Sequence, residues 1–240
     1  MSHLRDPASL TEQEIEEIEK QSLRCLYQAV VDFDFVAAEI FHESLDEVKD
    51  VAEDVTREML DRLGGYQIQQ RILGNVDYRK ARYVIFPSLS VRQALFVDSK
   101  AEKDRNSARL QVSQISMSVL QRRGGGLIEE RGRIPAISVY RDENYLSTIL
   151  LVHYYYEDDA DGRHTLKETT LVALPNAKLQ STYNPHADDT IWRVGPNAPT
   201  RGEEFRVRLG FTRLEGKARW RVQHIVYNAV SGRAEYEWQE

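Results

Sequence analysis

The periodicity of apolar residues changes near residue 76, and this change limits the folds that the chain can adopt. In the first third, apolar residues recur at helical spacing, whereas the second half contains short runs of β-forming residues. Strand-like runs cover 134–140, 149–156, 165–174, 204–211 and 220–227. The sequence therefore predicts a helical N-terminal portion and a strand-rich C-terminal portion.

Two helices are predicted in the first third of the chain. Thr11 is followed three residues later by Glu14, a capping box that begins a helix. A second helix is expected over about 45–63. The segment 105–122 also has helical spacing, and we expect the glycines at 124–126 to end it in a flexible loop.

The β-forming runs begin after residue 76 and are separated by turn-forming residues. Residues 78–86 and the apolar run 94–97 are predicted strands, the second of the buried type. The segment 158–162 has the composition of a hairpin turn. The longest irregular stretch, 183–201, is a candidate binding loop, because long loops in compact domains are often functional.

Length and composition indicate a single domain. The chain has 240 residues, of which 41% are hydrophobic and 29% are charged, as in an ordinary globular protein with one core. We expect one domain over 1–240, with its helical portion at about 8–65 and its strand-rich portion at about 134–240.

Several features argue against a membrane or exported protein. No apolar run approaches the roughly 20 residues that span a bilayer, and the acidic N-terminus lacks the apolar region of an export signal. Cys25 is the only cysteine in the sequence, so no intramolecular disulfide can form. We therefore expect a cytoplasmic protein with no membrane partner.

The charge balance excludes one class of nucleic-acid-binding protein. A formal net charge of −6 argues against a nonspecific coat protein, whose affinity depends on a basic excess. It does not exclude a sequence-specific enzyme, because the 32 Lys and Arg residues are enough to line one cleft while the outer face stays acidic.

The motif acid, any residue, lysine occurs at 47–49, 98–100 and 215–217. The first copy lies in an acidic helical stretch and the third in a predicted hairpin turn, so both indicate solvated surface charge. The second copy differs because it directly follows an apolar strand-like run. Strand alternation places the Asp98 carboxylate and the Lys100 ammonium on the same side of a strand that emerges from the core.

A second acid, Asp77, begins the preceding predicted strand, so two neighbouring strands can bring their acids together. Phosphodiester hydrolysis uses such a set: carboxylates hold Mg²⁺, and a cation orients water and offsets negative charge. The alternative is a structural ion pair at the sheet edge. Glu53 or Asp54 could supply a third acid, although a solvated helix face explains both.

Two arginines, Arg206 and Arg208, lie two residues apart in a predicted strand and therefore share a face. Guanidinium groups in this arrangement can form bidentate hydrogen bonds to successive guanines in the major groove. The alternative is a solvated sheet face covered by arginine side chains.

Many segments resemble the SfiI-like type II restriction endonucleases, which are related to BglI and belong to the PD-(D/E)XK nuclease superfamily. They follow in the same order, with similar spacing, over nearly the whole chain. These segments are 52–56, 76–79, 97–101, 110–111, 113–114, 152–156, 174–179, 183–185 and 199–203.

The resemblance implies an α/β fold of the PD-(D/E)XK type, with a mixed β-sheet flanked by helices. Carried over residue by residue, it makes Asp77 and Asp98 ligands of Mg²⁺ and Lys100 the catalytic lysine. Val76 stands where the general motif often has proline, which is a tolerated departure. The reaction implied is Mg²⁺-dependent hydrolysis of phosphodiester bonds in double-stranded DNA.

The resemblance also implies which residues read the DNA sequence. Arg206 and Arg208 match the base-reading arginines of the family. The family lysine before this strand is replaced by Pro196, beside Asn197, which puts the target sequence in doubt. A carboxamide can pair with a base edge, so Asn106 is a further candidate. We also expect DNA contacts from Arg105, Arg109 and Arg201.

Members of the family recognise interrupted GC-rich palindromes, which a two-fold dimer reads as two half-sites. Some members are dimers of dimers that act on two DNA sites, and others are dimeric. The extent of the resemblance favours a homotetramer over a homodimer. The resemblance also implies a location in the prokaryotic cytoplasm and no small-molecule substrate.

Two rival functions remain open. One is a noncatalytic, sequence-specific DNA-binding protein on the same fold. The other is a related nuclease with a different role, such as DNA repair. The intact set of Asp77, Asp98 and Lys100 argues against the first rival, because a protein that only binds DNA needs no metal site.

Overall fold

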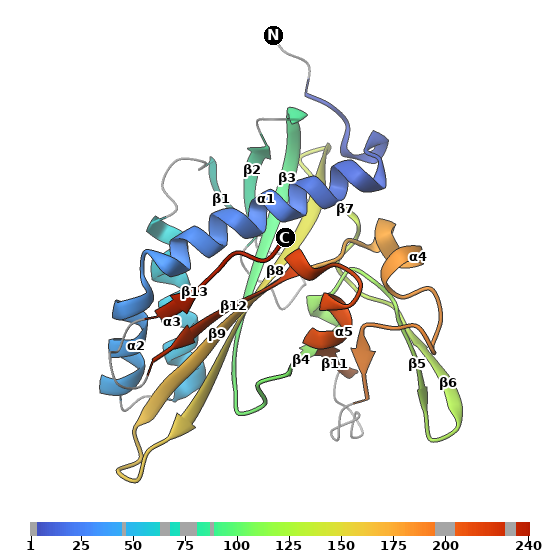
Figure 1. Cartoon of the computed structure of the whole chain (residues 1–240). Helices are drawn as coiled ribbons and strands as arrows, with labels where there is room; N and C mark the ends of the chain where they lie inside the picture. The colour runs from blue at the N-terminus through green and yellow to red at the C-terminus, as the bar shows by residue number, and fades with distance from the viewer. Residues whose placement is uncertain are drawn as a thin grey trace.

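The structure is a computed structural model that describes residues 4–44, 47–62, 68–72, 81–86, 89–194, 205–228 and 234–240. A mixed β-sheet forms its centre, with helices packed across it and two smaller sheets beside it (Figure 1). The α-helices are α1 (Glu12–Val31), α2 (Asp34–Glu43), α3 (Val48–Arg62), α4 (Gln180–Tyr183) and α5 (Phe211–Glu215). Short 3-10 helices are η1 (Pro7–Ser9), η3 (Val112–Gln114), η4 (Ala177–Leu179) and η5 (Arg219–Arg221).

Helix α1 begins at the predicted capping box. The Thr11 hydroxyl accepts a hydrogen bond from the Glu14 backbone N–H at 3.3 Å, and the Glu14 carboxylate accepts one from the Thr11 N–H at 2.9 Å. Helix α3 confirms the second predicted helix, with slightly narrower bounds. Helix α2 was not predicted. Its Ala37 and Phe41, four residues apart, are both buried.

Eight of the described strands form the main sheet, in the order β1-β2-β3-β8-β9-β12-β13, with β7 paired to β8. Strands β3 and β8 are parallel, and the other pairs are antiparallel. The strands are β1 (Ile68–Ile72), β2 (Ala81–Phe86), β3 (Val91–Glu102), β7 (Ile137–Tyr140), β8 (Glu143–Asp158), β9 (His164–Leu174), β12 (Val222–Tyr227) and β13 (Ala234–Tyr236). The strands predicted from the sequence are confirmed in the described parts of these regions, and residues 78–80 of the predicted strand 78–86 lie outside the described residues. The predicted turn between β8 and β9 is also confirmed, and Gly162 in it has φ +78°.

A smaller sheet of strands β10, β11 and β4 lies beside the main sheet. Its strands are β10 (Trp192–Arg193), β11 (Arg206–Gly210) and β4 (Ser107–Gln111). Strand β11 confirms the prediction for 204–211. In the stretch 183–201, predicted to be irregular, Tyr183 is the last residue of α4, and Trp192 and Arg193 form β10. Trp192 is buried because it packs in the core.

The predicted helix over 105–122 is wrong. This segment forms β4, η3 and the first part of β5 (Val119–Arg123). Ala108 and Leu110 are buried while Arg109 between them is partly exposed, so the apolar period is that of a strand. Gly124 and Gly125, with φ +54° and +83°, turn the hairpin of β5 and β6 (Gly126–Glu130) and do not end a helix.

The predicted hairpin turn at 215–217 is also wrong. Glu215 is the last residue of α5, and the chain then passes through a short turn into η5. The backbone N–H of residue 216 donates to the Thr212 carbonyl at 3.0 Å, which closes the end of this helix. The segment therefore joins a helix to β12 and does not connect two strands directly.

Two apolar cores lie on the two faces of the main sheet. Ile149 and Leu151 of β8 belong to the first core, together with β11 and the first half of α1. Leu150 and Val152 of β8 belong to the second, together with α2, α3 and the second half of α1. Because alternate residues of one strand enter different cores, β8 is buried on both faces, as strands of a central sheet are.

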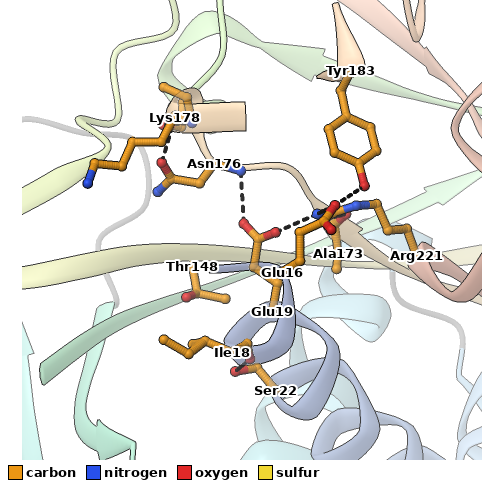
Figure 2. Close-up of polar contacts among 12 residues, drawn as sticks. Glu16, Ile18, Glu19, Ser22, Thr148, Ala173, Asn176, Lys178, Tyr183 and Arg221 are labelled. Carbon is orange, nitrogen blue, oxygen red and sulfur yellow. Dashed lines mark hydrogen bonds and ion pairs between the residues drawn. The ribbon is translucent and has the colours of Figure 1, made fainter. Parts of the chain in front are cut away.

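A buried ionic cluster joins α1 to the C-terminal part of the chain (Figure 2). Glu19 on α1 and Arg221 of η5 are both 0% exposed, with Glu19 Oε2 2.7 Å from Arg221 Nη2. Glu19 Oε1 accepts a hydrogen bond from the Asn176 backbone N–H at 2.8 Å, and Arg221 donates to the Ala173 carbonyl at 3.3 Å. The cluster thus fixes α1 against the end of β9.

None of the helices in the described ranges has the length and apolar character needed to span a membrane.

Candidate functional site

Asp98 and Lys100 lie on the same face of β3. The Lys100 Nζ is 2.9 Å from Asp98 Oδ2, and the side chains are 24% and 17% exposed, respectively. The predicted placement of both groups on one side of the strand is therefore confirmed. A partly buried pair interacts more strongly than an exposed pair, because less water screens its charges.

This face of β3 continues from the first apolar core, which the main sheet shares with the small sheet. Phe96 lies two residues before Asp98 and packs in the same core as Val207 and Leu209 of β11. Since side chains alternate along a strand, Asp98 and Lys100 extend the face that carries Phe96. The carboxylate and the ammonium therefore lie on the side of the main sheet that faces the small sheet.

Gln114 fixes the orientation of Asp98. Its Nε2 donates a hydrogen bond to Asp98 Oδ2 at 3.0 Å, and its Oε1 accepts one from the Gln111 backbone N–H at 2.9 Å. Gln114 is buried, so its amide has little freedom to turn. Gln114 was not predicted to have a role, because no strand or helix spacing connects it to Asp98.

Strand β8 places His153 next to Lys100, its register partner in the parallel pair. The imidazole is fully buried and packs edge-on against Phe211, with ring centroids 5.1 Å apart. In the described part of the chain, neither ring nitrogen has a hydrogen-bond partner. Burial lowers the pKa of His153 to about 4, so the ring is neutral at pH 7 and adds no charge beside the lysine.

The other candidate acids either lie outside the described residues or form ion pairs on α3. Asp77 lies outside the described residues. Glu53, 51% exposed on α3, pairs with Lys49 at 3.8 Å, and Asp54 pairs with Arg57 at 2.7 Å. Within the described ranges, no group of three or more His, Cys, Asp or Glu side chains forms a metal site. The roles of Asp77 and Glu53 stay predictions.

The small sheet carries a row of arginines across its three strands. Arg193 of β10 is opposite Arg208 of β11, and Arg208 is opposite Arg109 of β4. Directly opposite residues point to the same face, and Arg206 joins this face two residues along β11. The other face, with Val207 and Leu209, is buried in the core. Like charges placed opposite one another are unfavourable, so this row favours an anionic partner.

Two acids from the end of β3 approach this row. Arg208 Nη1 is 3.3 Å from Glu102 Oε2 and 3.1 Å from Asp104 Oδ2. Only the turn 103–106 separates β3 from β4. Neither acid was predicted to have a role, although strand alternation from Asp98 and Lys100 places Glu102 on the same face.

Arg105, a predicted DNA contact, forms an ion pair inside the protein. Its Nε is 2.5 Å from Oε2 of the buried Glu168, whose Oε1 is 2.6 Å from His224 Nδ1. His224 Nε2 is 2.9 Å from Glu215 Oε1. Burial alone would lower the pKa of His224, but the hydrogen bonds that its ring nitrogens donate to Glu168 and Glu215 outweigh it and raise the pKa. This cluster ties the turn after β3 to β9 and β12.

Of the remaining predicted DNA contacts, the structure describes only Asn106. Asn106 is exposed in the turn between β3 and β4, where its backbone N–H donates to Asp104 Oδ1 at 3.0 Å. Pro196, Asn197 and Arg201 lie outside the described residues.

The turn between β3 and β4 thus separates a carboxylate and an ammonium on β3 from a row of arginines that begins on β4. Arginines suit phosphate groups and base edges. A carboxylate beside a lysine suits hydrolysis of a phosphodiester.

Comparison with known proteins agrees with this arrangement. The family model described as type II restriction enzyme SfiI matches residues 27–225. The type II restriction enzyme SfiI of Streptomyces fimbriatus is 33% identical, over 98% of this chain and 93% of its own.

Two solved structures share the fold. The crystal structure of tetrameric restriction endonuclease SfiI bound to cognate DNA matches with a TM-score of 0.88 and 30% identity, over 99% of this chain and 94% of that one. The restriction endonuclease BglI, bound to its DNA recognition sequence, matches with a TM-score of 0.72 and 18% identity, over 88% and 90% of the two chains. At this identity the likeness to BglI shows the fold alone.

The family match includes β3, the turn after it and the strands of the small sheet. The predicted fold, a mixed sheet flanked by helices, and the predicted resemblance are both confirmed. The chain therefore belongs to the SfiI family of type II restriction endonucleases.

Proposed function

We propose that this protein cuts double-stranded DNA at an interrupted GC-rich palindrome, in a Mg²⁺-dependent reaction that hydrolyses one phosphodiester per active site. The observation that carries the proposal is the short path from the Asp98–Lys100 pair to the arginine row. The pair lies on β3 and Arg109 of the row lies on β4, with only the turn 103–106 between the two strands. We infer that a duplex bound to the arginines has its backbone near the pair.

The donor chemistry at Asp98 fits Mg²⁺. The ion prefers carboxylate oxygens, and Asp98 offers a partly exposed carboxylate that Gln114 holds in place. Asp98 would hold the ion together with Asp77, as the family resemblance implies, and Glu53 is a candidate third acid. When bound, Mg²⁺ supplies a Lewis acid that lowers the pKa of water and stabilises the leaving oxygen.

Lys100 supplies the fixed positive charge of the site. Its ammonium orients the attacking water and offsets the negative charge that develops on the phosphate. Its placement 2.9 Å from Asp98 keeps the side chain in position before the substrate arrives. Because His153 on β8 is neutral at pH 7, it neither adds to this positive charge nor offsets it.

The strand-rich portion, 134–240, reads the DNA. Arg206 and Arg208 present guanidinium groups on one face of β11, the arrangement that suits bidentate contacts with guanine. Arg109 adds positive charge beside them. The further candidates for DNA contacts are Asn106, Asn197, Arg201 and Arg105, the last after release from Glu168.

The protein is proposed to act as a homotetramer of two dimers in a prokaryotic cytoplasm. The support is the tetrameric assembly of the SfiI crystal structure, to which this chain is similar over nearly its full length. Sedimentation of the protein with and without DNA tests this assembly. Dimers alone under both conditions would contradict it.

The direct test of cleavage uses purified protein, Mg²⁺ and a large GC-rich DNA, followed by sequencing of the fragment ends. Discrete ends that share an interrupted palindrome are the expected result, and they define the target. Uncut DNA with sequence-specific binding retained would contradict the proposal and favour a noncatalytic DNA-binding protein. Ends without a common sequence would indicate a nonspecific nuclease instead.

A further inference from the structure

Arg208 is held by one of its nitrogens. Nη1 donates to Glu102 Oε2 at 3.3 Å, to Asp104 Oδ2 at 3.1 Å and to Ser107 Oγ at 3.1 Å. The side chain is 12% exposed. Three acceptors around one nitrogen restrict both the position of the guanidinium and its rotation about the side-chain bonds of Arg208.

The opposite edge of the guanidinium remains available. A guanidinium carries five N–H groups, and the contacts of Arg208 within the described residues all use Nη1. The N–H groups on Nε and Nη2 form a planar, two-donor edge. Such an edge matches the paired acceptors of a guanine in the major groove. Arg208 is therefore oriented for a bidentate contact before DNA arrives.

The two acids are themselves fixed. Asp104 accepts hydrogen bonds from the Asn106 backbone N–H at 3.0 Å and from the Ser107 hydroxyl at 2.7 Å. Glu102 Oε1 accepts one from the Arg109 backbone N–H at 3.3 Å. Burial alone would raise the pKa of Asp104, but these hydrogen bonds and the nearby Arg208 and Arg193 outweigh it and lower the pKa. Asp104 is therefore ionised at neutral pH.

The acids also change what the arginine row attracts. In the described part of the chain, the guanidinium groups of Arg109 and Arg193 form no ion pair, and a row of cations binds any phosphate backbone. Two carboxylates beside Arg208 repel phosphates but not the neutral acceptors of a base. A repulsive element directed at the wrong ligand raises specificity even where it lowers total affinity.

We propose that Glu102 and Asp104 are positioning residues that determine sequence specificity, by orienting Arg208 toward a base edge and excluding phosphate from it. This inference rests on the proposed function. In addition, the cleavage pair and the two acids that orient Arg208 all lie on β3 and the turn after it. One strand therefore positions both the groups that cut DNA and an arginine that reads its sequence.

The test compares Glu102→Gln, Asp104→Asn and the double variant with the wild type. Each change removes a charge and keeps the size of the side chain. Equilibrium binding is measured without Mg²⁺, on the target duplex found by end sequencing and on a random duplex, over a range of salt concentrations. The matched control is Glu14→Gln, which also removes one acid from an ion pair, with Arg5, but on α1 and outside the arginine row.

The expected result is tighter binding of random DNA by the double variant, with a discrimination ratio that falls about tenfold or more. The salt dependence on random DNA should steepen, because an additional phosphate is then contacted. The control should keep the wild-type ratio. In an Arg208→Ala background, Glu102→Gln should change the ratio no further.

Two results would overturn the inference. One is a double variant that folds, as judged by thermal unfolding, and keeps the wild-type ratio. The other is equal weakening on both duplexes, which a merely structural role would give. If the double variant does not fold, the two single variants decide the question in the same way. A wild-type protein with no sequence preference would instead contradict the proposed function itself.

Discussion

Arg221 and Arg208 both contact two acids, yet their surroundings give them different roles. Arg221 is 0% exposed, and its guanidinium lies between Glu19, Glu16 and two aromatic rings. Arg208 is partly exposed, lies between two further arginines and uses one nitrogen. The first cluster has no route for a polyanion, whereas the second has excess positive charge at the surface. The role of each arginine therefore depends on whether one edge of its guanidinium remains available to a ligand.

The largest effect should come from breaking the buried cluster. Arg221→Met leaves Glu19 as an uncompensated buried charge, which costs about 3–5 kcal/mol in the free energy of unfolding. Urea unfolding followed by circular dichroism measures this loss. Adding Glu19→Leu should recover much of it, because both charges are then absent. A single variant as stable as the wild type would show that the cluster is not structural.

A substitution in the arginine row should change DNA binding and leave the free energy of unfolding nearly unchanged. Arg206→Ala removes a bidentate base contact and should weaken binding to the target by about 1–3 kcal/mol, with little change on random DNA. The measurement is a pair of equilibrium titrations on the two duplexes. Arg163→Ala, which removes an arginine from the turn between β8 and β9, is the control. An unchanged preference for target DNA would remove Arg206 from base reading.

The pH dependence of stability at His153, which lies beside Lys100 and packs against Phe211, sharpens the comparison. Burial lowers its pKa to about 4 from an ordinary value of 6.5. Below pH 6.5 the unfolded chain binds a proton that the folded chain does not, so stability falls as the pH falls. At pH 5 this contribution is about 2 kcal/mol.

His153→Leu should remove this part of the acid sensitivity. Unfolding free energies at pH 7.5 and pH 5 should therefore differ less in the variant than in the wild type. Parallel pH dependence in the two proteins would mean that the imidazole is not held neutral by burial.

Local sequence rules predicted much of the fold. The capping box at Thr11 and the alternation through 149–156 and 165–174 are short-range signals, and the structure follows them. The segment 105–122 was misread because the spacing of its apolar residues fits a helix as well as a strand followed by a turn. Residues 34–43 were missed because their apolar residues are nearly continuous and show no clear period.

The long-range contacts that hold the fold and the site in place could not be predicted from the sequence in the same way. The pair of Asp98 and Lys100 was predictable because alternation fixes their common face. Glu19 and Arg221 are separated by 202 positions, and only tertiary packing brings them together. Gln114 reaches Asp98 because η3 turns the chain back toward β3. Such contacts depend on the fold as a whole.

The most direct test of the account separates cleavage from binding at β3. Cleavage of the target with Mg²⁺ and binding without it are measured for Asp98→Ala and Lys100→Ala, with Glu47→Ala of the exposed first copy of the motif as the control. We predict that cleavage falls about 1,000-fold or more in the first two variants while specific binding is largely kept, and that the control is unchanged. Cleavage at the wild-type rate by either β3 variant would contradict the assignment of the active site.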